Sequence, residues 1–248
     1  MTGRQAALLA PPVIWLAAFL VLPAGVLAVA AFGPEGLATL ARASTWALLG
    51  RSLACALFTT ALCLALGYPA AVFIAGCAPR TRTLLLFLVV VPFWTNLLVR
   101  TYALIVILRK ADALYTTGAV LVGLVHSFLP FMILPLVTSL EKVPRRLLEA
   151  SEDLGASPWQ SFWRVTVPLT MPGIAAGSLL VFIPVLGIFA LPEFLGGAKV
   201  YLVGMHINLL FIQDGHSPGG AALTLLLLVA TTVLLTVYHR VRRPEGLA

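Results

Sequence analysis

The chain has 248 residues, of which 60% are hydrophobic and only 10% are charged, whereas an average soluble domain is about 25% charged. This composition excludes a soluble enzyme, a disordered regulator and a nucleic-acid-binding module, because each needs more polar surface than 9 acidic and 16 basic side chains supply. Hydrophobic stretches of about 20 residues recur along the whole length, so we predict one multispanning membrane domain over residues 1–248.

Six hydrophobic segments are long enough to cross a bilayer, and they lack the alternation of barrel strands. We therefore predict an all-α integral membrane protein with spans at about 12–32, 48–75, 84–108, 118–140, 172–192 and 219–240. The first segment resembles a secretory signal peptide, but from Val13 to Phe32 it exceeds the roughly 7–15 apolar residues of a signal core. It is therefore predicted to persist as the first span.

Basic residues are distributed unevenly between the two sets of loops that six spans create. With a cytoplasmic N-terminus, 10 fall inside, namely Arg4, Arg80, Arg82, Lys142, Arg145, Arg146, Arg164, Arg240, Arg242 and Arg243, and 5 fall outside, namely Arg42, Arg51, Arg109, Lys110 and Lys199. Cytoplasmic loops carry an excess of Lys and Arg, so this bias predicts both termini and the segment 141–171 in the cytoplasm. It also accounts for the net charge of +7 without a nucleic-acid-binding patch.

The segment 141–171, between the fourth and fifth predicted spans, has the pattern of a helix-turn-helix. Small and apolar residues at helical spacing predict a short amphipathic helix over 145–154: Leu147, Ala150, Ser151 and Leu154. Gly155 follows, where a left-handed residue commonly ends a helix. An N-cap, a proline at N1 and a capping-box glutamine then predict the start of a second helix: Ser157, Pro158 and Gln160.

The second helix has an unusually aromatic face for a loop outside the membrane, formed by Trp159, Phe162, Trp163 and Thr166. One interpretation is that the helix pair rests on lipid headgroups. The acidic residues beside the turn, Glu149, Glu152 and Asp153, argue against an anionic lipid surface. They favour a cytoplasmic protein partner with an apolar recess.

The triplet Glu149-Ala150-Ser151, then Gly155, then Val165, Val167 and Pro168, has the spacing of a family motif. It resembles the EAA loop of permease subunits of bacterial ABC importers, with Ser151 in place of the usual second alanine. The resemblance implies that this loop is a coupling helix that docks in a groove of an ATPase subunit. The coupling residues it implies are Glu149, Ala150, Ser151, Asp153, Gly155, Ser157, Pro158 and Trp159.

Further motifs resemble the spermidine/putrescine-type permeases: Gly67-Tyr68-Pro69, Pro92-Phe93-Trp94-Thr95-Asn96, Arg100-Thr101-Tyr102, Gly177-Ser178-Leu179-Leu180-Val181-Phe182-Ile183-Pro184 and Leu195-Gly196-Gly197. Many members carry an acid after that last proline, where this chain has Gly187-Ile188-Phe189. The resemblance implies a path through the bacterial inner membrane for a small charged, polyamine-like solute delivered by a periplasmic binding protein. It also implies a second permease subunit, expected to be a different chain, and two ATPase subunits.

Arg100 is the only Asp, Glu, Lys or Arg residue deep within a predicted span, where a central position costs about 2.5–3.5 kcal/mol on insertion scales. In one interpretation it faces the translocation path beside Asn96 and Tyr102. In the other, the third helix is broken near Asn96 and Arg100 reaches the outer interface. Glu193 and Asp214 bracket the connection between spans five and six, either at the mouth of the path or in a solvated loop.

The sequence contains no HExxH or GxSxG motif, and no GxxxxGK[ST] motif for binding ATP phosphates. We therefore predict no catalytic residue, no metal site and no cofactor bound by this chain, with ATP and Mg held by partner ATPase subunits. A stand-alone secondary transporter is the alternative, but it should show paired repeats or several intramembrane charges. An integral membrane enzyme would need a convergent set of acid, base and nucleophile.

Overall fold

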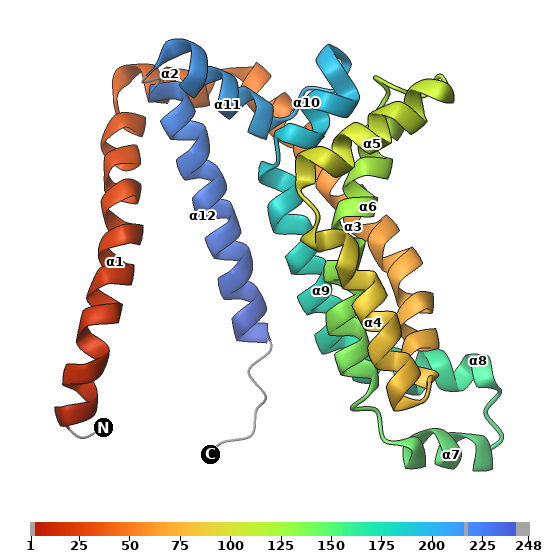
Figure 1. Cartoon of the computed structure of the whole chain (residues 1–248). Coiled ribbons are helices and arrows are strands. Elements are labelled where there is room, and N and C mark those ends of the chain that lie inside the picture. The colour runs from red at the N-terminus through yellow and green to blue at the C-terminus, as the bar shows by residue number, and fades with distance from the viewer. Residues whose placement is uncertain (1–2, 216–217, 242–248) are drawn as a thin grey trace. The chain divides into compact units, whose positions relative to one another are not determined.

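The computed structural model describes residues 3–215 and 218–241. Within these ranges the chain is almost entirely helical and has no strand. The helices in chain order are α1 (Gly3–Ala31), α2 (Pro34–Ala41), α3 (Ala43–Gly76), α4 (Pro79–Trp94), α5 (Leu97–Lys110), α6 (Thr117–Leu140), α7 (Arg145–Asp153), α8 (Pro158–Ser161), the π-helical turn η1 (Phe162–Thr166), α9 (Val167–Gly187), α10 (Ala190–Gly196), the 3-10 turn η2 (Gly197–Lys199), α11 (Val203–Asp214) and α12 (Pro218–Val241) (Figure 1).

The chain forms two compact units. One comprises Met1–Leu49 with His206–Val233, and the other comprises Gly50–Met205 with Leu234–Ala248. In the first unit, Ala31, Ala221 and Ala222 form a small buried cluster covered by Leu27, Ala30, Leu40 and Leu225. The second unit contains α4 to α10 and most of α3, and therefore most of the residues that the sequence marks as functional.

Within the described residues, five helical segments are long and apolar enough to cross a membrane: Pro11–Ala31, Ala43–Gly76, Thr117–Leu140, Pro158–Gly187 and Pro218–Tyr238. Helices α4 and α5 pass the same test only as a pair, bent by 91° at their break, so these residues contain 5 or 6 candidate spans. The prediction of an all-helical multispanning protein is confirmed at this level.

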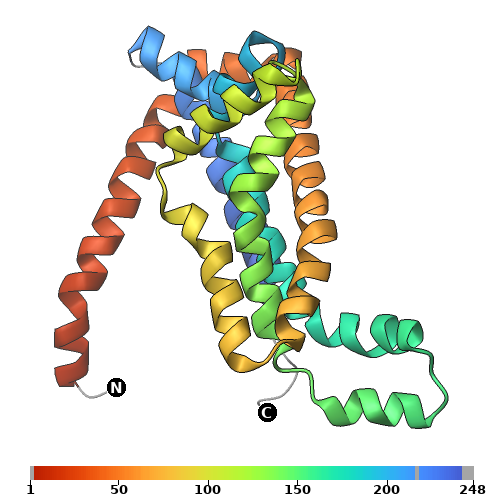
Figure 2. The same cartoon turned by 45° about the vertical axis from the view of Figure 1, so that its right-hand side comes forward.

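The third predicted span, 84–108, is wrong as a single helix, because α4 ends at Trp94 and α5 begins at Leu97 (Figure 2). Pro92 lies in the last turn of α4, and Thr95 follows in an extended conformation. The side chain of Asn96 accepts a hydrogen bond of 2.8 Å from the Leu98 amide, so a new helix begins there.

The fifth predicted span, 172–192, begins within a longer helical stretch that runs from Pro158 to Gly187 through α8, η1 and α9, so its predicted end at 192 is wrong. The second helix of the predicted helix-turn-helix is continuous with this stretch. Pro168 lacks an amide proton, and η1 places a wider turn directly before it. Ile188 is extended and ends the helix.

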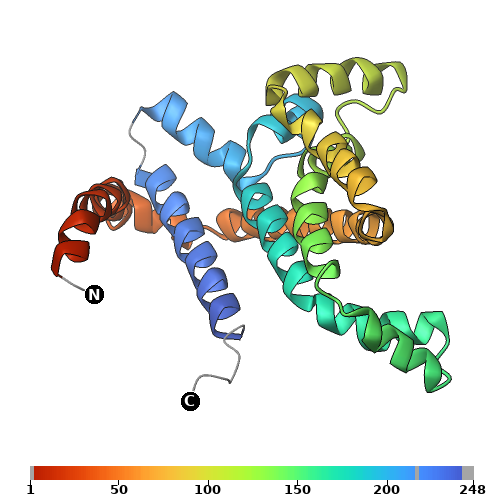
Figure 3. The same ribbon diagram turned by 60° about the horizontal axis from the view of Figure 1, so that its bottom comes forward.

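Helices α6 and α9 lie side by side and make the most extensive contact between helices of the second unit (Figures 1 and 3). A Cβ atom at Gly173 would lie 2.5 Å from the Ser139 Cβ, and one at Gly177 would lie 2.7 Å from the Met132 sulfur. Gly173 and Gly177 are one helical turn apart and share a face of α9. Small residues at this spacing let two membrane helices approach closely.

Helix α3 packs against the same centre from another side. A Cβ atom at Gly67 would lie 3.1 Å from the Met132 Cγ, and the Met132 side chain is fully buried. The Tyr68 hydroxyl forms a 2.7 Å hydrogen bond with the Thr170 hydroxyl, which joins α3 to α9 in a buried position. Three helices therefore meet around Met132.

Replacing Gly173 with alanine should destabilise the protein by about 1–3 kcal/mol, because the added methyl group overpacks the α6–α9 contact. The check is the thermal unfolding temperature of the purified protein in detergent. Gly50→Ala is the matched control, since a Cβ there meets nothing within 4 Å and alanine favours a helix. An unfolding temperature of Gly173→Ala at or above that of the control would contradict the close approach.

Candidate functional site

Helices α7 and α8 lie at one end of the second unit, beyond the ends of α4 and α6, in both views (Figures 1 and 2). No residue of α7 is buried. The local structure agrees with the sequence pattern, since a helix over 145–153 is followed by a turn and a second helix from Pro158.

The turn between α7 and α8 depends on a left-handed glycine. Gly155 has a φ of +80°, which other residues adopt only at a cost. Its amide donates to the Glu152 carbonyl at 2.8 Å, and the Ala156 amide donates to the Ser151 carbonyl at 3.0 Å. A Cβ at Gly155 would meet nothing within 4 Å, so the requirement for glycine is conformational rather than steric.

The start of α8 has the complete capping box that the sequence predicts. The Gln160 amide donates to the Ser157 hydroxyl at 3.3 Å, and the Ser157 amide donates to the Gln160 side-chain oxygen at 2.9 Å. Pro158 occupies the first helical position, where its missing amide proton costs no hydrogen bond. The direction in which the chain leaves the turn is thus fixed by local contacts.

A pair of serine hydroxyl groups joins the two helices. The Ser151 hydroxyl donates to the Leu148 carbonyl at 2.7 Å, and it also lies 2.7 Å from the hydroxyl of the buried Ser161. Because Ser151 has one proton and gives it to Leu148, Ser161 must be the donor between the two hydroxyl groups. The serine that departs from the usual motif therefore contributes a contact that alanine lacks.

The outer face of the helix pair is apolar and acidic, and we call it the coupling surface. Leu154 is 89% exposed and Trp159 is 69% exposed, which is unusual for such large apolar side chains. The coupling surface comprises Leu147, Glu149, Ala150, Glu152, Asp153, Leu154, Trp159 and Trp163, all of them exposed. Large exposed apolar side chains on the same helix pair as three exposed acids fit a protein partner better than an anionic membrane.

The inner side of the pair is anchored to the bundle. The Phe162 ring packs edge-on against the Tyr68 ring, with 5.5 Å between centroids. Tyr68 in turn bonds to Thr170, and the Trp159 ring stacks on Phe162 at 5.8 Å. These contacts would therefore transmit a displacement of α8 to α3 and α9.

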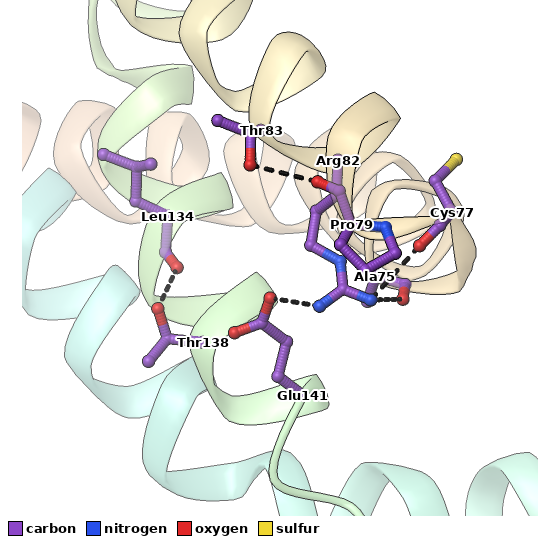
Figure 4. Close-up of polar contacts among 8 residues, drawn as sticks. All are labelled: Ala75, Cys77, Pro79, Arg82, Thr83, Leu134, Thr138 and Glu141. Atoms are coloured by element: carbon purple, nitrogen blue, oxygen red, sulfur yellow. Dashed lines mark hydrogen bonds and ion pairs between the residues drawn. The ribbon is translucent and has the colours of Figure 1, made fainter.

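An ion pair anchors the other side, between Arg82 at the start of α4 and Glu141 directly after α6 (Figure 4). The Arg82 guanidinium donates to a Glu141 carboxylate oxygen at 2.7 Å and to the carbonyls of Ala75 and Cys77 at 3.0 and 3.2 Å. The ends of α3, α4 and α6 are thus held together where the chain enters the helix pair. The Arg82–Glu141 pair was not predicted from the sequence, although the two side chains have opposite charges and fall on the same predicted side of the membrane.

The path candidates lie on α5 and α10, two helices that contact each other, or at their starts. The exposed Tyr102 has its ring centroid 6.0 Å from that of Phe194, and the neighbouring Glu193 is exposed. Asn96 caps α5 and is exposed. Asp214 was predicted to lie with Glu193 beside the connection between spans five and six, and its side chain lies outside the described part of the chain.

Arg100 lies in the first turn of α5, not in the middle of a straight span. Its guanidinium carbon is 5.9 Å from the centroid of the Phe93 ring, a cation–π distance. Its Nε atom is buried and has no hydrogen-bond partner among the described residues. The break near Asn96 that the second interpretation required is present, while a role of Arg100 in the path stays a prediction.

Comparisons with known proteins match this chain to a family. The model of the binding-protein-dependent transport system inner membrane component matches residues 64–243. The spermidine/putrescine transport system permease protein PotB of Escherichia coli (strain K12) is 44% identical over 77% of this chain and 76% of its own length. PotB of Haemophilus influenzae is also 44% identical, over 77% of this chain and 73% of its own length. The inner membrane ABC transporter permease protein YdcU of Escherichia coli is 31% identical, over 77% of this chain and 70% of its own length.

The fold also has a counterpart among solved structures. A chain from the crystal structure of the bacterial alginate ABC transporter in complex with an alginate pentasaccharide-bound periplasmic protein is similar, with a TM-score of 0.73. The match covers 98% of this chain and 95% of that chain at 18% identity. At this identity the likeness concerns the fold alone.

Replacing Gly155 with valine should loosen the helix pair, because a β-branched residue in the left-handed conformation costs about 1–2 kcal/mol. Amide hydrogen exchange over residues 145–161 should then accelerate about 5–30-fold. Ala150→Val adds the same side chain at an exposed helical position and should accelerate exchange much less. Equal exchange in the two variants would show that the turn does not depend on Gly155.

Proposed function

The chain belongs to the family of binding-protein-dependent transport system inner membrane components, and from this premise we propose how its helix pair couples ATP hydrolysis to transport. It is a permease subunit of an ABC importer. The observation that carries the proposal is the coupling surface on α7 and α8, which is exposed on its outer side and anchored to α3 and α9 on its inner side.

The proposed partners follow from what the chain lacks and what it exposes. Two ATPase subunits hold ATP and Mg, since this sequence has no phosphate-binding GxxxxGK[ST] loop. One of them receives the coupling surface in an apolar groove. A second permease subunit, a different chain, completes the path, and a periplasmic binding protein delivers the solute.

The proposed mechanism follows the continuity of the helices. Closure of the ATPase subunits displaces α8, and because α8, η1 and α9 form one helical stretch, the motion reaches the membrane without passing through a loop. The Phe162–Tyr68 contact transmits it to α3. Rigid-body displacement of these helices then switches the path between inward and outward access.

The proposed solute is a small cation of the polyamine class. Support comes from relatives named as spermidine/putrescine permeases at 44% identity. Where many members of that group carry an acid, this chain has Gly187-Ile188-Phe189 at the break between α9 and α10. Exposed aromatic rings at Trp94, Tyr102 and Phe189 offer cation–π contacts in place of a carboxylate.

The proposed orientation has both termini and the helix pair in the cytoplasm of a bacterium, with the spans in its inner membrane. It rests on the distribution of basic residues between the loops; Arg242 and Arg243, which contribute to it, lie outside the described residues. A cysteine at Ser157 should react with a membrane-impermeant thiol reagent only after the cells are opened. Labelling of this cysteine in intact spheroplasts would show that the helix pair faces the periplasm and would contradict the proposed orientation.

Glu149→Lys should weaken the association with the ATPase subunit about tenfold or more, because it reverses a charge on the coupling surface. The measurements are co-purification of the ATPase subunit and stimulation of ATP hydrolysis by the loaded binding protein. Lys110→Glu, a charge reversal at the end of α5, is the control and should leave both unchanged. If transport proceeds without any ATPase subunit, the chain acts as a stand-alone secondary transporter and the proposal is wrong.

Arg100→Leu should abolish uptake of labelled spermidine while leaving insertion and ATPase association intact, because a charge within an apolar segment is more often functional than structural. Insertion itself should improve. Arg109→Leu, in the exposed last turn of α5, is the control and should retain uptake. Normal uptake by Arg100→Leu would show that the guanidinium serves only the contact with Phe93.

A further inference from the structure

A cavity of about 610 Å³ lies in the second unit, between the N-terminal part of α3, the start of α6 and the segment 199–202. Its volume is within the range of about 300–1,000 Å³ that is typical of ligand pockets. None of its lining residues belongs to the coupling surface or to the path candidates. The cavity therefore has no role in the proposed transport cycle.

The α3 wall of the cavity changes from basic to apolar along one helical face. Arg51, Ala54, Cys55 and Phe58 all line it and follow the spacing i, i+3, i+4 and i+7. On α6, Thr117 lies at the first turn and Leu121 one turn further in. The basic end of the cavity thus lies at the level of the start of α6, and the apolar end lies further along both helices.

The change from basic to apolar lining residues fits a position at the boundary between lipid headgroups and hydrocarbon. The 26 residues from Arg51 to Gly76 span about 38 Å at 1.5 Å per residue, whereas the hydrocarbon core is about 30 Å thick. With α3 as a span, Arg51 lies at the headgroup level and Phe58 lies within the hydrocarbon. Phe58 is 55% exposed, so it has an apolar face left to cover.

Two cations at the basic end have no counter-ion among the described residues. Arg51 and Lys199 both line the cavity and are exposed, and neither belongs to an ion pair among the described residues. Both also lie on the side that the distribution of basic residues leaves poor in positive charge. Tyr201 lies beside them in the lining, and burial raises the pKa of its phenol, which stays protonated at neutral pH.

We propose that this cavity binds the headgroup of an anionic phospholipid, with the phosphate between Arg51 and Lys199 and an acyl chain along Ala54 and Phe58. A soluble phosphate would fill only the basic end and leave the apolar wall uncovered. A zwitterionic lipid also has a phosphate, but it would bring its own cationic group close to the two basic side chains. Only an anionic amphiphile satisfies both ends of the cavity.

Binding there would strengthen a junction that the chain already makes. The Val203 amide donates a hydrogen bond of 2.8 Å to the Ser52 hydroxyl, next to Arg51. A phosphate bonded to both Arg51 and Lys199 would add a second link between α3 and the segment 199–202. The lipid would thereby fix the connection that leads from α10 to α11.

The test is native mass spectrometry of the complete transporter, purified with its partner subunits and titrated with equal parts of phosphatidylglycerol and phosphatidylcholine. Phosphatidylglycerol should bind preferentially to the wild type. Its affinity should fall about fivefold in Arg51→Gln or Lys199→Gln and about thirtyfold in the double variant. The double variant Arg109→Gln/Lys110→Gln removes the same charge at the end of α5 and should bind as the wild type does.

Two further measurements keep the proposal open to refutation if a variant assembles poorly. Arg51→Lys keeps the charge and should keep the lipid, and phosphatidylglycerol should raise the unfolding temperature of the wild-type complex more than phosphatidylcholine does. Equal binding of the two lipids overturns the proposal. So does unchanged lipid binding in the double variant accompanied by loss of the second permease or the binding protein, since the cavity would then be a protein contact.

Discussion

The close approach of α6 and α9 is the constraint on which the rest of the second unit depends. Glycine at 173 and 177 removes the side chains that would hold the helices apart, and Met132 fills the space between them and α3. The two helices are also the ones that lead into and out of the helix pair. Because a filled interior deforms little, displacement of the pair moves α6 and α9 together rather than one past the other.

Polar contacts at the same end connect this rigid centre to its neighbours. Arg82 binds Glu141 and two carbonyls at the end of α3, and Tyr68 binds Thr170. Each contact joins helices that the sequence separates widely, and each lies close to the point where a partner would push. A partly exposed ion pair contributes little to stability, at most about 1 kcal/mol, so its value lies in fixing geometry.

The local features of the site could be predicted from the sequence because they depend on neighbouring residues. The left-handed Gly155 and the capping box of Ser157 and Gln160 require only a few consecutive positions. Hydropathy averages over about 20 residues, so it could not decide between a straight third span and a helix broken near Asn96. The contacts of Arg82 and Tyr68 depend on tertiary packing between helices far apart in the sequence, so no local pattern encodes them.

The π-helical turn η1 sets the angle, about the helix axis, between the side chains of α8 and those of α9. The Val167 amide bonds to the Phe162 carbonyl five residues earlier, so the turn holds one residue more than an α-helical turn. Each residue rotates an α-helix by about 100°. Deleting one residue here would therefore turn the Trp159 side chain of α8 about a quarter of a circle away from its present direction while α9 kept its glycines on α6. Insertions and deletions in this turn thus offer evolution a way to re-aim the partner-facing surface without altering the membrane-embedded packing.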